Sequence, residues 1–148
     1  MSLIAWQANR GIVPHEVTTD EITELFAVVD RDLADAAVPR LSADWQLGIG
    51  YNAALQLATL ALAAAGYRPV RERAHERAIL SLEHTVGTPQ ATINLLDAVR
   101  RRRNIINYER AGTTSDAEAA EVLAAASALR AQIARWLRRN HPTLLQPS

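Results

Sequence analysis

The segment from Arg100 to Tyr108 holds the residue types best suited to chemistry on an anion. Four consecutive arginines, Arg100 to Arg103, are followed by Asn104, Asn107 and Tyr108. A guanidinium group presents a planar fork of donors that matches phosphate or carboxylate oxygens. Amide and phenol side chains add further donors and acceptors. Arg100, Arg103, Asn104 and Asn107, with Tyr108 beside them, are therefore candidates for a phosphate-binding site.

The predicted helix that carries this segment places Arg103 on an apolar stripe. At about 100° per residue, Arg103 shares a face with Leu96 and Val99. A buried guanidinium without a partner is costly, so anionic or carbonyl oxygens must meet this end of the stripe.

Two sources of such oxygens stay open. In a structural interpretation, Arg100 and Arg103 pair with acids of the first predicted helix or with C-terminal carbonyls, and Arg101 and Arg102 are solvated. In a functional interpretation, the oxygens belong to a bound phosphate. A further basic surface is conceivable on the last helix, at Arg130, Arg135, Arg138 and Arg139. A run of this kind is more often simply a solvated helix face.

Composition places the chain among small proteins with one domain. Its 148 residues suffice for a core, and without cysteine they form neither disulfides nor thiolate metal sites. No basic start followed by an apolar run marks a signal peptide, so we expect a cytoplasmic protein. Residues 1–66 hold three arginines and eight acids, whereas residues 67–148 hold thirteen arginines and eight acids. Such asymmetry favours self-association or an anion-binding face.

Helix signals recur along the chain and no strand signal does, which predicts an all-α fold. We expect an up-and-down antiparallel bundle of about five helices over residues 18–141, with a loosely ordered arm at 1–17 and a tail at 142–148. The helices are expected at 18–37, from Ser42 or Asp44 to Gly66, at 70–86 with Pro69 in the first turn, from Thr88-Pro89 onward, and from Ser115 to before Pro142. The second helix is apolar over most of its circumference, so it is either central or shared with a partner. Its many alanines and its internal polar residues argue against a membrane span.

Three short motifs, in order, resemble the HEPN superfamily (higher eukaryotes and prokaryotes nucleotide-binding). They are Tyr51-Asn52-Ala53-Ala54, Gly66-Tyr67-Arg68 followed by His75, and Arg103-Asn104-Ile105-Ile106-Asn107-Tyr108. The resemblance covers roughly residues 20–140. It implies a dimeric helical bundle and, in the catalytic members, a ribonuclease of toxin type that uses no metal or other cofactor.

The resemblance also implies residue roles. Arg103 would hold the scissile phosphate, and Asn104 would orient it. The family's histidine, which would move the proton of the ribose 2′-hydroxyl, is replaced by Tyr108, and no histidine occurs between His84 and His141. A tyrosine with a pKa near 10 is a poor general base at neutral pH, so catalysis is expected to be weakened or lost.

The expected function is therefore binding of RNA or a nucleotide phosphate by a homodimer. The alternative is a protein-interaction module, dimeric or paired with a nucleotidyltransferase-type antitoxin. In that alternative the Arg-Asn cluster is structural and the second helix, with Gly48 and Gly50, forms the interface. No metal site is predicted, because Glu72-x-x-His75 has no second pair to complete a di-iron centre.

Overall fold

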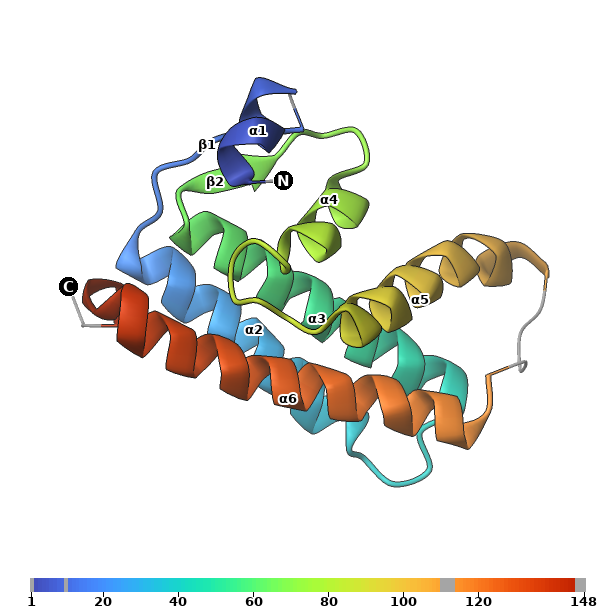
Figure 1. Ribbon diagram of the computed structural model, residues 1–148. Coiled ribbons are helices and arrows are strands. Elements are labelled where there is room, and N and C mark those ends of the chain that lie inside the picture. Colours follow the sequence, from blue (N-terminus) through green and yellow to red (C-terminus); the bar gives the residue numbers. More distant parts are fainter. Residues whose placement is uncertain (1, 10, 110–113, 146–148) are drawn as a thin grey trace.

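The computed structural model describes residues 2–9, 11–109 and 114–145, with the backbone alone for residues 103–109 (Figure 1). In chain order the elements are α1 (Leu3–Ala8), β1 (Ile12–Pro14), α2 (Thr19–Ala36), α3 (Ala43–Ala64), β2 (Tyr67–Pro69), α4 (Ala74–Ser81), α5 (Gln90–Glu109), α6 (Asp116–Asn140) and the 3₁₀ turn η1 (Pro142–Leu145). The fold is a helical bundle with one tiny sheet, which confirms the predicted all-α class.

Local capping signals fix the start of α2, α3 and α6. Thr18, Ser42 and Ser115 are the N-caps of α2, α3 and α6, and each side chain accepts a hydrogen bond of 3.1–3.2 Å from the backbone N–H three residues on. These bonds satisfy donors that have no partner inside the helix. Of the two candidates for α3, Ser42 rather than Asp44 is the cap.

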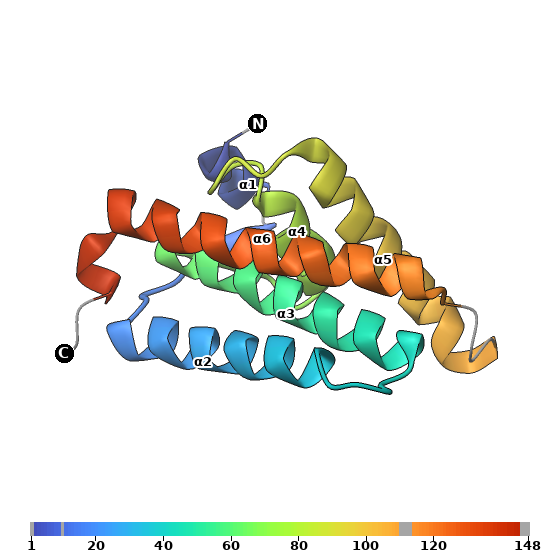
Figure 2. The same ribbon diagram turned by 90° about the horizontal axis from the view of Figure 1, so that it is seen from below.

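The core is organised around α3, which packs against α2 and α6 and, on another side, against α4 and α5 (Figures 1 and 2). Leu57 and Leu60 are fully buried, as is Ile133 of α6. The apolar circumference of this helix thus reflects a central position in the fold. Although α3 is long and apolar enough to cross a bilayer, 72 % of its most apolar window is buried inside the protein, as is usual for a core helix.

Gly50 sets the close approach of α3 to α6. A Cβ atom at this position would lie 2.9 Å from Cδ2 of Leu123 and 3.3 Å from Cγ1 of Val122. An alanine here would therefore require the Leu123 side chain to move aside. Gly50 packs inside the chain and does not line the partner interface that the alternative prediction assigned to it, whereas Gly48 keeps some exposure.

Residues 1–17 do not form the loosely ordered arm that the sequence predicted. They contain α1 and β1, and β1 pairs antiparallel with β2 in the register Ile12↔Pro69 and Val13↔Arg68. Ile12 is fully buried. Residues 142–145 of the predicted tail form η1, which brings Leu144 against the core. Three-residue strands are too short for an alternating pattern, and their pairing is not local in sequence.

The third predicted helix, 70–86, is shorter than expected. Pro69 ends β2 instead of opening the helix, and α4 spans only Ala74–Ser81. Arg73 precedes α4 in a left-handed conformation with φ of 58°. Gly66 follows α3 with φ of 97°, which confirms its predicted place after that helix, because glycine adopts this region without strain.

Candidate anion-binding end of helix α5

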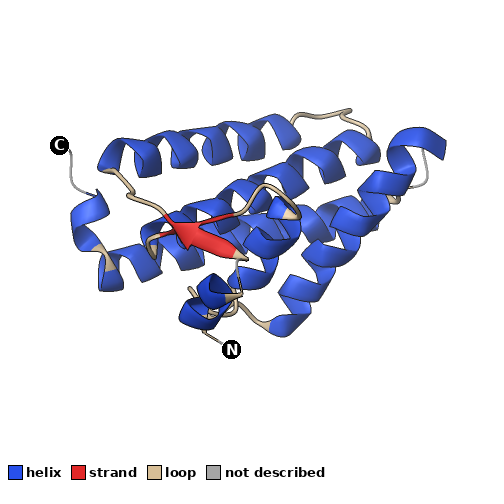
Figure 3. Ribbon diagram, turned by 90° about the horizontal axis from the view of Figure 1, so that it is seen from above, coloured by secondary structure: helices blue, strands red, loops and turns tan. Residues whose placement is uncertain are grey.

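The N-terminal half of α5 is anchored in the bundle and its C-terminal half leaves it. Ile93, Leu96 and Val99 are buried at helical spacing. Beyond them the helix continues without a break to Glu109, and its end projects past the neighbouring helices (Figures 1 and 3). The side chains of Arg103, Asn104, Asn107 and Tyr108, which make up most of the predicted site, lie outside the described residues. Their backbone positions form the last two turns of α5.

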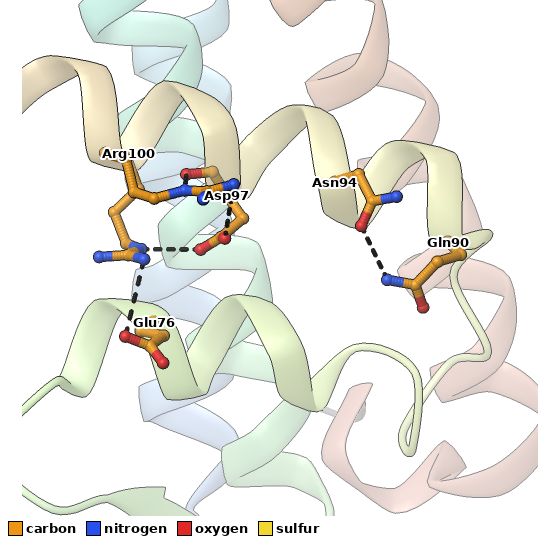
Figure 4. A network of polar contacts seen from close by, with 6 residues as sticks. Glu76, Gln90, Asn94, Asp97 and Arg100 are labelled. Atoms are coloured by element: carbon orange, nitrogen blue, oxygen red, sulfur yellow. Dashed lines mark hydrogen bonds and ion pairs between the residues drawn. The ribbon is translucent and has the colours of Figure 1, made fainter.

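Arg100 is the member of the predicted site whose contacts are described, and it is bound by acids of its own chain (Figure 4). Its Nε donates a hydrogen bond of 2.9 Å to Oδ1 of Asp97, and its Nη2 lies 3.6 Å from Oε2 of Glu76 in α4. Only 19 % of the Arg100 side chain is exposed. The structural interpretation therefore holds for Arg100, but its partners belong to α4 and α5, not to the first predicted helix.

The two arginines that follow differ in exposure. Arg101 is 66 % exposed, and its Nη2 lies 3.3 Å from Oδ2 of Asp97. Arg102 reaches α6, where its Nη1 donates to Oε2 of Glu118. This hydrogen bond holds the pKa of the Glu118 carboxyl below its ordinary value. The prediction that both side chains are solvated fits the exposed Arg101. It is wrong for Arg102, because Glu118 of α6 lies close enough to pair with it.

Charges in the described part of this end are balanced. Three carboxylates, those of Glu76, Asp97 and Glu118, face the three guanidinium groups of residues 100–102. An anion bound here must therefore draw a guanidinium away from its carboxylate or meet further donors on the last turns of α5. Asp97 precedes Arg100 by three residues, a spacing that sequence reasoning alone indicates as a pair. Glu76 and Glu118 carry no such local signal.

The Tyr-x-Ala segment of α3 serves the core in the structure. Tyr51 is 3 % exposed, and Ala53 and Ala54 are fully buried. Nδ2 of Asn52 donates a hydrogen bond of 2.8 Å to Oδ2 of Asp32 in α2. Asp32 is itself buried, and a buried carboxylate without a hydrogen-bond partner is destabilising. This bond therefore offsets the cost of burying Asp32 and links α2 to α3.

In the second candidate basic surface, on α6, Arg130 already forms an ion pair with Asp30 of α2. Nε and Nη2 of Arg130 donate to the two carboxylate oxygens of Asp30 at 2.9 and 3.0 Å. The guanidinium also lies 4.7 Å from the ring centroid of Phe26. Arg135, Arg138 and Arg139 are exposed toward the C-terminal end of α6. This surface is therefore smaller than the sequence suggested.

The Asp30–Arg130 pair is expected to make stability depend on acid pH. The hydrogen bond from Arg130 lowers the pKa of the Asp30 carboxyl, so the pair stabilises the fold above the ordinary pKa and is lost as pH falls through the lowered one. Because Asp30 is 53 % exposed, the effect should not exceed about 1 kcal/mol. Thermal melts between neutral and acid pH of the natural chain and of Asp30→Asn measure it. Parallel pH profiles in the two proteins would contradict the assignment.

Comparison with known proteins gives no match: no protein-family model, no curated protein and no solved structure matches this chain. The HEPN resemblance therefore stays a hypothesis that rests on the three short motifs. Among the residues that the structure describes, no three His, Asp or Glu side chains gather into a metal-binding group.

Proposed function

We propose that this chain is a HEPN-like domain that binds RNA or a nucleotide phosphate at the C-terminal end of α5. One observation carries the proposal: Ile93, Leu96 and Val99 fix α5 in the bundle, and the arginine run begins directly after Val99. Arg101, with 66 % of its side chain exposed, already offers a donor group to solvent there. Arg100 is held by Asp97 and Glu76, so in this proposal it orients the helix, and the ligand is contacted by the residues that follow it.

The residue roles in this proposal follow the family resemblance. Arg103 contacts the phosphate, Asn104 orients it, and Asn107, one turn beyond Arg103, adds an amide. Because α5 is helical through Glu109, positions 103 and 108 are about 140° apart around its axis. Tyr108 therefore shares a face with Asn104 rather than with Arg103.

Tyr108, at the position of the family's histidine, limits the catalysis that this site can perform. A tyrosine hydroxyl with its ordinary pKa near 10 accepts a proton poorly at neutral pH. Tyr108 would act as a proton donor or as an orienting group, so cleavage of RNA is expected to be slow or lost while binding persists. In this proposal the chemistry needs no metal ion, because the guanidinium group of Arg103 takes the role of stabilising the phosphate.

A protein-interaction role is the second candidate, because the described arginines already have partners within the chain. Arg100 and Arg102 each contact a carboxylate from another helix, which suits a structural function of the cluster. In that case the partner would be a second copy or an antitoxin of the nucleotidyltransferase type. A gene for a small nucleotidyltransferase next to this one would favour the antitoxin.

Incubation with a mixed RNA pool in excess EDTA tests the proposed function. The natural chain should form an RNA complex that survives chelation, and any cleavage should survive it too. Arg103→Ala should weaken the complex by at least about tenfold, the loss expected of one good charged contact. Arg71→Ala, an exposed arginine outside both candidate basic surfaces, is the matched control and should bind as the natural chain does. Equal binding by Arg103→Ala and the natural chain would contradict the site.

A further inference from the structure

Arg102 and Glu118 form the ion pair that links the arginine run of α5 to α6. Nη1 of Arg102 donates to Oε2 of Glu118, and both side chains stay partly exposed, 41 % for the arginine and 39 % for the glutamate. An exposed ion pair adds little net stability, because water and salt screen it. This pair can therefore open at low cost when another anion competes for the guanidinium group.

Glu118 offers Arg102 the same kind of oxygens that a phosphate does. The hydrogen bond from Arg102 holds the pKa of the Glu118 carboxyl below its ordinary value, so this side chain is fully charged at neutral pH. Carboxylates and phosphates both accept paired hydrogen bonds from a guanidinium fork. The two groups therefore compete for the same donors.

The neighbouring Arg100 is held more firmly. Its guanidinium group lies 2.9 Å from Oδ1 of Asp97 and 3.6 Å from Oε2 of Glu76, and only 19 % of the side chain is exposed (Figure 4). Drawing Arg100 away from two carboxylates in a partly buried place costs more than drawing Arg102 away from one at the surface. Of these two arginines of α5, each bound to a carboxylate of another helix, Arg102 is thus the one that a ligand can take.

Glu118 has a second favourable position after such an exchange. It is the third residue of α6, and Ser115 is the N-cap. Oγ of Ser115 accepts a 3.1 Å hydrogen bond from the backbone N–H of Glu118 and donates one of 3.3 Å to Oε1 of the same residue. In a capping box, a carboxylate at this position reaches back to the backbone N–H of the cap residue, where the helix dipole also favours negative charge. The carboxylate thus keeps polar partners at the start of α6 when Arg102 leaves it.

We infer that Glu118 is an internal competitor of the ligand: its carboxylate occupies Arg102 in the free protein, and an RNA or nucleotide phosphate displaces it. This inference rests on the proposed function and names a contact that regulates the same site. The phosphate gains the guanidinium group of Arg102, next in sequence to Arg103, while Glu118 turns back toward Ser115. Because an anion must hold Arg102 better than Glu118 does, the contact favours phosphates that meet several donors at once over isolated anions.

Affinity for a labelled single-stranded RNA, measured by fluorescence anisotropy, tests this competition. Glu118→Gln keeps the shape of the side chain and removes its charge, so it should strengthen binding by about two- to fivefold, the range set by an exposed ion pair. Glu121→Gln removes the same charge from an exposed position one turn further along α6 and is the matched control, which should bind as the natural chain does. Thermal melts of both variants check that the fold is kept.

A double-mutant cycle with Arg102→Ala separates competition from a general effect of charge. If Glu118 acts through Arg102, Glu118→Gln should give no gain in a chain that also carries Arg102→Ala. Weaker binding by Glu118→Gln alone would overturn the inference, because it would show that the contact positions α5 for the ligand instead of competing with it. Unchanged binding, or an equal gain with and without Arg102, would overturn it too.

Failure of the competition is distinguishable from failure of RNA binding itself. RNA binding that is lost in Arg103→Ala but unchanged in Glu118→Gln would refute the competition and leave the proposed function standing. Binding by Glu118→Gln together with no binding by the natural chain would support the competition and contradict the proposed function. Absence of binding in both proteins would refute both.

Discussion

Leu57→Ala is expected to lower the free energy of unfolding by about 2–5 kcal/mol, the usual cost of truncating a fully buried leucine. Leu57 lies at the centre of α3 with no exposed surface. Helix α3 contacts α2, α4, α5 and α6, so a cavity at this position cannot close by the shift of one neighbour. For a chain of this size the loss corresponds to roughly 2–4 °C in Tm per kcal/mol.

Chemical denaturation of the natural chain and of Leu57→Ala measures this change. Leu145→Ala, the same truncation at a side chain with 38 % exposure, serves as the control and should change stability by no more than about 0.5 kcal/mol. Similar losses in the two variants would mean that α3 is not the centre of the core.

Asn52→Ala is expected to lower stability by about 1–3 kcal/mol, because it removes the donor that faces a buried carboxylate. Oδ2 of Asp32 accepts the 2.8 Å hydrogen bond from Asn52, and Oδ1 keeps only the 3.3 Å contact with Arg31. The penalty comes mainly from the buried Oδ2 atom of Asp32 that is left without a donor, not from the lost bond itself.

A double-mutant cycle separates these two causes. The cycle consists of Asn52→Ala, Asp32→Ala and the variant that carries both changes; because the double variant removes both polar groups, it should be more stable than Asn52→Ala. Gln56→Ala, one turn further on the same face of α3, controls for changes of that surface and should have little effect. Additive losses in the cycle would show that the two side chains do not interact.

The parts of the fold that could be predicted from sequence are those fixed by nearby residues. Thr18, Ser42 and Ser115 cap helices through hydrogen bonds that span three residues, and Gly66 ends α3 through its own conformation. The apolar stripe of α6 is equally local. Such signals depend only on helix geometry and on one side chain at a time.

The parts that could not be predicted depend on contacts between distant segments. Ile12 is buried because β1 meets β2, and Pro69 ends a strand because that partner exists. At the candidate site, the Asp97–Arg100 pair follows from spacing on one helix. The contacts of Arg100 with Glu76 and of Arg102 with Glu118 require the packing of α5 against α4 and α6.

The salt dependence of RNA affinity tests the central claim most directly, since each phosphate contact contributes its own counterion release. Fluorescence anisotropy with a labelled single-stranded RNA, over a series of salt concentrations, gives the slope of log affinity against log salt for the natural chain, Arg103→Ala and the control Arg71→Ala. Arg103→Ala alone should bind more weakly, and its slope should be shallower by roughly 0.7, the share of one phosphate contact. Identical affinity and slope in all three proteins would contradict an RNA or phosphate site at the end of α5.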